Sequence, residues 1–386
     1  MRRAGLASLV FLLGLNAGCS WVGDYIRGSD NTTPPTPLTE IVQSVSVQRV
    51  WQTDVGSGSQ GSYVRLVPAV AQGRVYAAGR DGEVLALDAA SGNAVWRIDT
   101  ELSISAGVGL GDGLILVGTD KGEVLALRAE NGTEAWRAKV SSEVLAAPRA
   151  AGGVTVVRSG DGRFTGLDSR TGERRWVYSY TLPALTLRGA AAPLLGEGVA
   201  ISGLDNGKLL VLALNNGAPV WEKSIAPPRG RTDLERMVDI DSEPRLAGDV
   251  LYAAAYQGNV SAIDLSNGNL LWSRDFSSHA GLAVDARQVY LADEDDQIWA
   301  LDRRNGATLW KQDGLKGRRL STPVVQGEYV VFGDFEGYLH WLSRDDGRMV
   351  GRVRADGAGI AALQVVDGVL YALGRGGSLG AYRIGG

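Results

Sequence analysis

One segment recurs along the whole chain and constrains its fold more than any other feature. The frame at 82–96, GEVLALDAASGNAVW, returns in copies that end at Trp136, Trp176, Trp221, Trp272 and Trp310. A further copy carries Gly351 in place of the tryptophan, and the last copy begins at Gly377 and stops with the sequence. A period near forty residues indicates a series of equivalent supersecondary units, each of which packs against the next.

Each unit has the pattern of four short β-strands. In the first complete unit, an apolar run at 74–79 precedes an Asp-Gly turn, residues 83–88 alternate, and a Ser-Gly turn leads to an outer strand at 94–96. Asp-Gly and Ser-Gly dipeptides between apolar runs are strong hairpin signals, because glycine reaches positive φ without steric cost. Helical repeats would instead need apolar spacing near 3.6 residues. The strand before these three is expected at 66–70, with counterparts at 146–148, 191–193 and 321–323.

The units predict an all-β fold, an eight-bladed β-propeller of four-stranded antiparallel blades that covers 46–386. Residues 50–54 match 95–99 but follow no strands of their own, and the last unit lacks its outer strand. We therefore expect the N-terminal strand to complete the last blade, which removes exposed sheet edges. The repeated tryptophans are expected to pack between neighbouring sheets, because an indole buries a large apolar area.

The N-terminal segment has the pattern of an export signal. Arg2 and Arg3 precede an apolar run at 6–15, which is too short for an ordinary membrane span, and small residues lead to Cys19, the sole cysteine. Residues 1–18 resemble a bacterial lipoprotein signal, although Asn16 stands where leucine is usual. The resemblance implies a lipid anchor on Cys19 and sorting to the outer membrane, and several acyl chains would hold the protein there stably. Residues 19–45, polar and proline-containing after the cysteine, are expected to be the anchor and a flexible tether.

Two connections between units are longer than the others. The spacing between tryptophans grows from 40 residues to 45 before Trp221 and to 51 before Trp272, and the extra residues lie at 177–189 and 222–242. Both connections lead from an outer strand to the next inner strand, so we expect them on one face of the ring. Loops on a rigid β-scaffold commonly carry function, although neutral drift in loop length explains the spacing equally well.

The residues offer no recognisable catalytic or metal motif. The two histidines, His279 and His340, lie in different units, and Cys19 is the only thiol. The acidic run at 293–296 lacks the spacing of a calcium loop and is expected to be a solvated turn. The net charge of −4 argues against nucleic-acid binding, which needs a basic surface. We therefore predict no enzyme activity, no metal and no cofactor.

The repeat VYAAGRDGEVLALDAASGNAVW resembles that of quinoprotein dehydrogenases, and the whole chain resembles the BamB family. The second resemblance rests on the lipoprotein signal, the length, LTLRG at 185–189 and Asp-Ile-Asp at 239–241. It implies a non-catalytic lipoprotein scaffold of the β-barrel assembly machinery, anchored in the outer membrane and facing the periplasm. Such a scaffold assists the folding and insertion of outer-membrane β-barrel proteins. The other subunits of the complex, and unfolded outer-membrane proteins, are its candidate partners.

The resemblance also implies a docking site. In that family the positions matching five residues of the two long connections bind the periplasmic POTRA domains of BamA: Leu185, Leu187, Arg188, Asp239 and Asp241. We expect the leucines to be apolar anchors, the arginine to form a charge-assisted contact, and the aspartates to accept hydrogen bonds from the partner. Pairing of the first connection with the edge of a POTRA sheet is a further hypothesis.

Two other functions stay open at this point. A dehydrogenase dependent on pyrroloquinoline quinone would share the repeat, but those enzymes carry adjacent cysteines and a calcium site, and this chain has no Cys-Cys pair. A periplasmic binding module for polysaccharide or peptide has little support. Outside the repeated tryptophans we expect few aromatic residues at the surface, since Trp299 and Trp341 lie on apolar strands.

Overall fold

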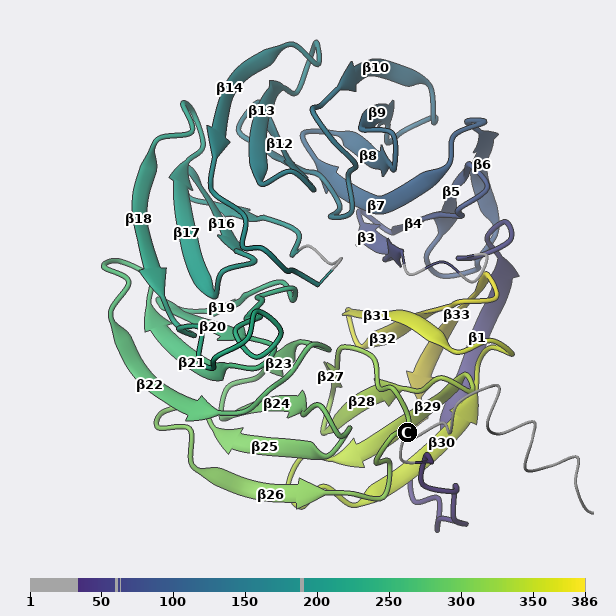
Figure 1. Ribbon diagram of the computed structural model, residues 1–386. Helices are drawn as coiled ribbons and strands as arrows, with labels where there is room; N and C mark the ends of the chain where they lie inside the picture. Colours follow the sequence, from purple (N-terminus) through teal and green to yellow (C-terminus); the bar gives the residue numbers. More distant parts are fainter. Residues whose placement is uncertain (1–33, 60–61, 63, 188–190, 386) are drawn as a thin grey trace, which may run out of the picture. The chain divides into compact units, whose positions relative to one another are not determined.

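The computed structural model describes residues 34–59, 62, 64–187 and 191–385, and Thr36–Gly386 form one compact unit. In this unit the strands form eight antiparallel sheets arranged radially around a ring, which confirms the predicted eight-bladed propeller (Figure 1). We call each sheet a blade and number the blades along the chain. Across the described residues, no helix has the length and apolar character needed to cross a bilayer.

The first four blades follow one another along the chain, each from its innermost to its outermost strand. Blade 1 consists of β3 (Ala69–Ala71), β4 (Arg74–Ala78), β5 (Glu83–Asp88) and β6 (Ala94–Asp99). Blade 2 consists of β7 (Ile104–Gly111), β8 (Leu114–Thr119), β9 (Glu123–Arg128) and β10 (Glu134–Lys139). Blade 3 consists of β11 (Arg149–Ala151), β12 (Val154–Ser159), β13 (Arg163–Asp168) and β14 (Arg174–Ser179). Blade 4 consists of β15 (Leu194–Gly196), β16 (Val199–Gly203), β17 (Lys208–Ala213) and β18 (Pro219–Ser224).

The next three blades repeat this order. Blade 5 consists of β19 (Arg245–Ala247), β20 (Val250–Ala254), β21 (Asn259–Asp264) and β22 (Leu270–Asp275). Blade 6 consists of β23 (Leu282–Val284), β24 (Gln288–Ala292), β25 (Ile298–Asp302) and β26 (Thr308–Gln312). Blade 7 consists of β27 (Val324–Gln326), β28 (Tyr329–Gly333), β29 (Tyr338–Ser343) and β30 (Met349–Arg354).

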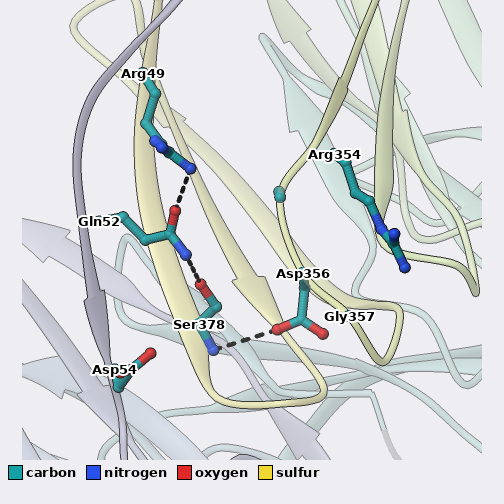
Figure 2. Close-up of a pocket in the computed structure, with 8 residues that line it drawn as sticks. Arg49, Gln52, Asp54, Arg354, Asp356, Gly357 and Ser378 are labelled. Carbon is teal, nitrogen blue, oxygen red and sulfur yellow. Dashed lines mark hydrogen bonds between the residues drawn. The ribbon is translucent and has the colours of Figure 1, made fainter.

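Blade 8 is built from both ends of the propeller sequence. It contains β31 (Ile360–Val366), β32 (Val369–Gly374), β33 (Ser378–Ile384) and, outermost, β1 (Val47–Asp54). Strand β1 pairs antiparallel with β33, so the predicted closure by the N-terminal strand is confirmed. Figure 2 shows a shallow pocket at this closure, where Gln52 on β1 donates a hydrogen bond to the Ser378 hydroxyl on β33. The amide of Ser378 in turn donates to Asp356 at 3.3 Å.

The innermost strands differ from the prediction at their starts. In blades 1, 3, 4 and 7 the strand begins directly after the proline that the prediction had placed inside it or at its end. Proline has no N–H to donate to a sheet ladder, which explains the displaced start. In blade 1 the residues before the proline instead form β2 (Arg65–Leu66), which pairs in parallel with β7 and gives blade 2 a fifth strand.

Seven tryptophans connect neighbouring blades with one repeated geometry. Each lies on an outermost strand, and its indole N–H donates to a backbone carbonyl in the last hairpin turn of the next blade. For example, Trp51 donates to Ala89 at 3.0 Å and Trp310 donates to Arg344 at 2.8 Å. The ring also lies flat on the glycine of that turn, since a Cβ added to Gly92 would be 2.6 Å from Trp51. The predicted packing role of the tryptophans is thereby confirmed.

The missing eighth tryptophan coincides with the closure of the ring. Gly351 occupies the tryptophan position on β30 and faces blade 8, whose third and fourth strands are joined by no hairpin turn. An indole there would have no turn carbonyl to reach. The space is filled by Val45, which is buried and lies 2.5 Å from an ideal Cβ on Gly351. The link between these blades is made instead by Gln326, which accepts from the Trp341 indole at 2.8 Å and donates to the Tyr382 carbonyl at 3.1 Å.

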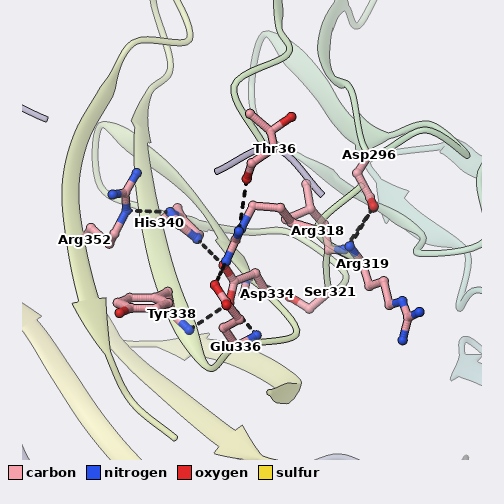
Figure 3. Close-up of polar contacts among 12 residues, drawn as sticks. Thr36, Asp296, Arg318, Arg319, Ser321, Asp334, Glu336, Tyr338, His340 and Arg352 are labelled. Carbon is pink, nitrogen blue, oxygen red and sulfur yellow. Dashed lines mark hydrogen bonds and ion pairs between the residues drawn. The ribbon is translucent and has the colours of Figure 1, made fainter. Parts of the chain in front are cut away.

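Residues 36–45 belong with the propeller and are not part of a free tether. Thr36 donates through its amide to the Lys316 carbonyl at 2.9 Å. Its own carbonyl accepts from Arg318 at 3.1 Å (Figure 3). Arg352 donates to the Thr39 carbonyl at 2.9 Å, and Leu38 packs against the buried cluster of blades 6 and 7. The tether expected at 19–45 therefore ends earlier than predicted, because this segment finds apolar and arginine partners on the ring.

A buried hydrogen-bond network holds Arg318 and Arg352, the two arginines that bind this segment. Asp334 accepts from Arg318 at 2.9 Å and from His340 Nε2 at 2.9 Å, while Arg352 donates to His340 Nδ1 at 3.2 Å. His340 is fully buried, and burial lowers its pKa, so the imidazole is neutral and accepts from Arg352. Neighbouring Asp296 is also buried and accepts from the amides of Arg319 and Leu320 at 2.6 and 2.9 Å. The expectation of a solvated acidic turn at 293–296 was thus wrong for Asp296.

The contact between indole and glycine predicts a difference between two alanine substitutions. Gly92 and Gly73 both have φ of 72°, but nothing lies within 4 Å of a Cβ added at Gly73. Both variants incur the cost of a positive φ, about 1–2 kcal/mol. Only Gly92→Ala meets the Trp51 ring, which adds about 1–3 kcal/mol. Urea unfolding should show this extra loss, and equal losses for the two variants would contradict the role of the contact.

The closure predicts that restoring the repeat destabilises the protein. Substitutions toward a consensus usually stabilise a fold. Gly351→Trp should instead lower the free energy of unfolding by about 1–3 kcal/mol or more, because the indole must displace Val45 from a packed interior. Thermal and urea unfolding measure the effect. A Gly351→Trp variant as stable as the natural chain would show that the missing tryptophan has no structural reason.

Candidate functional site

The two long connections lie together in the structure. The first loop (180–193) follows β14 and leads to β15, and the second loop (225–244) follows β18 and leads to β19. The amide of Leu187 in the first loop donates to Asp239 Oδ2 in the second loop at 3.2 Å. The second loop is tied to blade 5 in turn, because Tyr256 donates through its amide to the Asp239 carbonyl at 2.8 Å. The spacing of the tryptophans had therefore selected two segments that form one region.

Apolar side chains of both loops reach solvent. Leu185 is 46% exposed, and Leu187 is half-buried next to its hydrogen bond with Asp239. Leu234 in the second loop is 62% exposed, and the sequence analysis had not selected it. Its only signal in the sequence is a leucine within an otherwise charged stretch, TDLERM. Arg188, predicted to belong to the same site, lies outside the described residues, as does Cys19.

The two predicted aspartates lie inside the protein. Asp239 is fully buried and Asp241 is 4% exposed, so neither presents its carboxylate to an incoming partner. This differs from the expectation that both accept hydrogen bonds from another protein. Their burial follows from the course of the second loop, where Val238 and Ile240 alternate with them and belong to the apolar cluster of blades 4 and 5.

A buried arginine stands beneath this region. Arg158 on β12 donates to the Gly203 carbonyl at 3.0 Å, to Asp205 Oδ1 at 2.6 Å and to the Tyr180 hydroxyl at 3.0 Å. Tyr180, the first residue of the first loop, donates to Asp205 Oδ2 at 2.5 Å. Burial raises the pKa of Tyr180, so its hydroxyl keeps the proton that it donates. Arg158 had not been selected, although an arginine in the apolar strand VTVVRS is a recognisable exception to the repeat.

Three carboxylates meet above Arg158. Asp205, Asp239 and Asp241 each offer an oxygen, and these oxygens lie within 4.8 Å of one another. Such a group is geometrically able to hold a cation, but both oxygens of Asp205 already accept from Arg158 and Tyr180. Arg65 adds a second positive charge, since it donates to the Asp241 carbonyl. With two arginines supplying the counter-charge, we assign no metal to the cluster.

The surroundings of Asp239 and Asp241 favour the protonated form of their carboxyl groups. One oxygen of Asp239 and one of Asp241 are buried with no hydrogen-bond donor among the described residues. Burial, followed by the charges of Asp241 and Asp205, raises the pKa of Asp239 to about 9. Burial likewise raises the pKa of Asp241. We therefore expect one carboxyl proton on this pair as the missing donor, because two adjacent buried carboxylates cannot both ionise readily.

Comparison with known proteins places the chain among assembly factors. A family model described as outer membrane protein assembly factor BamB matches residues 43–103, 80–312 and 304–384. The chain belongs to the BamB family. A BamB from Alkalilimnicola ehrlichii is 53% identical over 348 residues, which are 90% of this chain and 91% of that relative. The crystal structure of BamB from Moraxella catarrhalis is similar with a TM-score of 0.81 at 28% identity, over 88% of this chain and 100% of that one.

The resemblance to quinoprotein dehydrogenases extends to the fold alone. The quinohemoprotein alcohol dehydrogenase from Comamonas testosteroni has a TM-score of 0.69 over 94% of this chain and 82% of its own, but its sequence is only 15% identical. The dehydrogenase alternative thus gains no support beyond the shared propeller of the BamB family and these enzymes.

The shared proton predicts a pH dependence of stability. Asp239 keeps its proton in the folded chain up to a pH of about 9 and loses it near pH 4 when unfolded. The free energy of unfolding should therefore fall as pH rises between these values, by at most about 1.4 kcal/mol per pH unit for one proton. Asp239→Asn should flatten this slope in urea titrations between about pH 5 and 9.

A surface carboxylate provides the control for this titration. The Ser266 hydroxyl and amide lower the pKa of Asp264, so Asp264→Asn should leave the slope above pH 5 unchanged. Equal slopes for the natural chain and for Asp239→Asn would show that Asp239 is ionised in the folded state.

Proposed function

We propose that this chain is a non-catalytic scaffold of the machinery that folds and inserts outer-membrane β-barrel proteins. Its relatives are named outer membrane protein assembly factors, which supports a role in assembly at that membrane. The observation that carries the proposal is the joining of the two loops, which exposes leucines on a rigid ring. Apolar side chains held at fixed positions suit binding of a folded partner better than chemistry on a small substrate.

The proposed partner is BamA, through its periplasmic POTRA domains. Leu185 and Leu234 are the exposed apolar side chains of the two loops, and in this proposal they and Leu187 are the anchors of the contact. Arg188 contributes a charge-assisted contact at the rim. Asp239 and Asp241 act from beneath, since Asp239 accepts the amide hydrogen of Leu187 and fixes the course of the first loop. Other subunits of the complex and unfolded outer-membrane proteins are further proposed partners.

The proposed location is the periplasmic face of the outer membrane. Lipid attached to Cys19 would anchor the chain, and the propeller unit begins at Thr36. An extended chain spans at most about 3.6 Å per residue, so the sixteen residues from 20 to 35 reach about 55–60 Å at full stretch. The anchor would therefore keep the ring close to the membrane in which the barrels assemble.

Binding to purified BamA POTRA domains tests the proposal. Leu185→Ala should weaken binding about tenfold or more, because truncation of a central apolar anchor removes more than 1 kcal/mol. Leu309→Ala is the matched control, since Leu309 is 49% exposed on the outer strand of blade 6 and distant from both loops. Calorimetry with both variants gives the comparison. Equal affinities of the natural chain and of Leu185→Ala would place the contact elsewhere, and no binding by the natural chain would reject BamA as the partner.

A further inference from the structure

Arg158 connects the start of the first loop with blade 4. Its guanidinium donates to the Tyr180 hydroxyl at the start of the first loop and to Asp205 in the turn between β16 and β17. It also donates to the Gly203 carbonyl at the end of β16. The side chain is 2% exposed, so these are contacts inside the protein and none faces a partner. A planar guanidinium is the one side chain that can hold several acceptors at fixed angles.

The same guanidinium supplies positive charge to the second loop. Asp239 and Asp241 are buried beside Asp205, and buried carboxylates are tolerated only near compensating charge or shared protons. Asp205 and Arg158 act electrostatically on both aspartates of this pair, and Arg65 acts on Asp241. Arg65 comes from the short strand β2 and reaches the carbonyl of Asp241. Arg158 is thus the cation that both docking loops have in common.

We propose that Arg158, with Tyr180 and Asp205, is the positioning group of the proposed BamA-binding surface. Tyr180 sets where the first loop leaves β14, and Asp239 receives the amide of Leu187 further along the same loop. The leucines between these two fixed points are thereby presented in one arrangement. The inference rests on the proposed function and adds the residues that set the geometry of its site without touching the partner.

The alternative is that Arg158 only stabilises the propeller. A buried ion pair can commonly be replaced by apolar residues of similar volume with little change in stability, whereas removal of one partner is costly. The double substitution Arg158→Met with Asp205→Leu therefore separates the two roles. It removes both charges together and leaves apolar contacts between blades 3 and 4. Because it also leaves the Tyr180 hydroxyl and the Gly203 carbonyl without these partners, some loss of stability is expected in either case. A purely stabilising role predicts that this is the only change, and that the folded variant has the partner affinity and the local amide exchange of the natural chain.

A second ion pair between blades, which is more exposed than the pair of Arg158 and Asp205, provides a control of similar geometry. Arg80 on blade 1 donates to Asp120 on blade 2 at 2.7 Å and to the Ile104 carbonyl at 3.2 Å, which is the same arrangement of one carboxylate and one carbonyl. Neither docking loop takes part in it. Arg80→Met with Asp120→Leu should leave binding of the POTRA domains unchanged.

Two measurements test the proposal. In hydrogen exchange followed by mass spectrometry, the peptide that contains Leu187 should exchange about tenfold faster in Arg158→Met/Asp205→Leu than in the natural chain, because the hydrogen bonds that fix Tyr180 at the start of that loop are lost. Peptides from blades 6 and 7 should be unchanged. In calorimetry, at a temperature at which the variant is folded, it should bind POTRA domains about tenfold more weakly than the natural chain.

The outcomes separate the inference from the function on which it rests. If the double variant exchanged the Leu187 peptide and bound POTRA domains as the natural chain does, the positioning role would be overturned and the proposed binding surface would stay intact. Faster exchange in the double variant would support the positioning role even if the natural chain did not bind POTRA domains, since exchange needs no partner. If the double variant does not fold, Arg158→Lys is measured instead. Arg158→Lys keeps the positive charge but lacks the several N–H donors of the guanidinium. Faster exchange of the Leu187 peptide is again expected. Exchange at the rate of the natural chain would overturn the positioning role.

Discussion

The hydrogen bond from an indole to the turn of the next blade, with the ring lying on that turn's glycine, is the contact on which the propeller depends. It needs two residues at a fixed separation, a tryptophan on each outer strand and a glycine in each last turn. The sequence shows both at each step of the repeat, from Trp51 with Gly92 to Trp310 with Gly347. The contact is identical at seven of the interfaces and absent at the eighth, where the ring is joined and no hairpin turn exists. Gly351 is therefore a consequence of closure and not a decayed copy.

The fold could be predicted because its signals are local. Turn pairs, alternation and the period lie within stretches of about forty residues, and the matching of 50–54 with 95–99 was enough to place the closing strand. The errors concern residues whose environment comes from distant parts of the chain. Asp296 is buried where the amides of Arg319 and Leu320 donate to it, and residues 36–45 are held by Arg318, in the connection between blades 6 and 7, and by Arg352 on blade 7. Neither partner can be identified from the sequence around the residue itself.

In the two loops of the proposed BamA-binding surface, too, local features could be predicted and long-range contacts could not. Loop length identified both segments, and the leucine at 185 lies at the surface as expected. The burial of Asp239 and Asp241 was missed because a carboxylate in a loop is ordinarily solvated, and the groups that make burial tolerable, Arg158, Arg65 and a raised carboxyl pKa, come from tertiary packing. Arg158 lies 81 positions before Asp239 in the sequence, and no periodic signal connects the two. Residues that act through others are the hardest to recognise in one sequence, since their partners are set by tertiary packing.

The structure departs from the regular repeat at the closure and around Arg158. At the closure an apolar side chain from the N-terminal segment fills the space, and the result is a well-packed join. Between blades 3, 4 and 5 the indole contacts and apolar clusters of the repeat are present, and a cluster of Arg158 and three aspartates is buried in addition to them. A buried ion pair often stabilises a fold no more than apolar groups of the same volume. Its hydrogen bonds are directional, and directional bonds can fix the course of a loop where an apolar surface would let it shift.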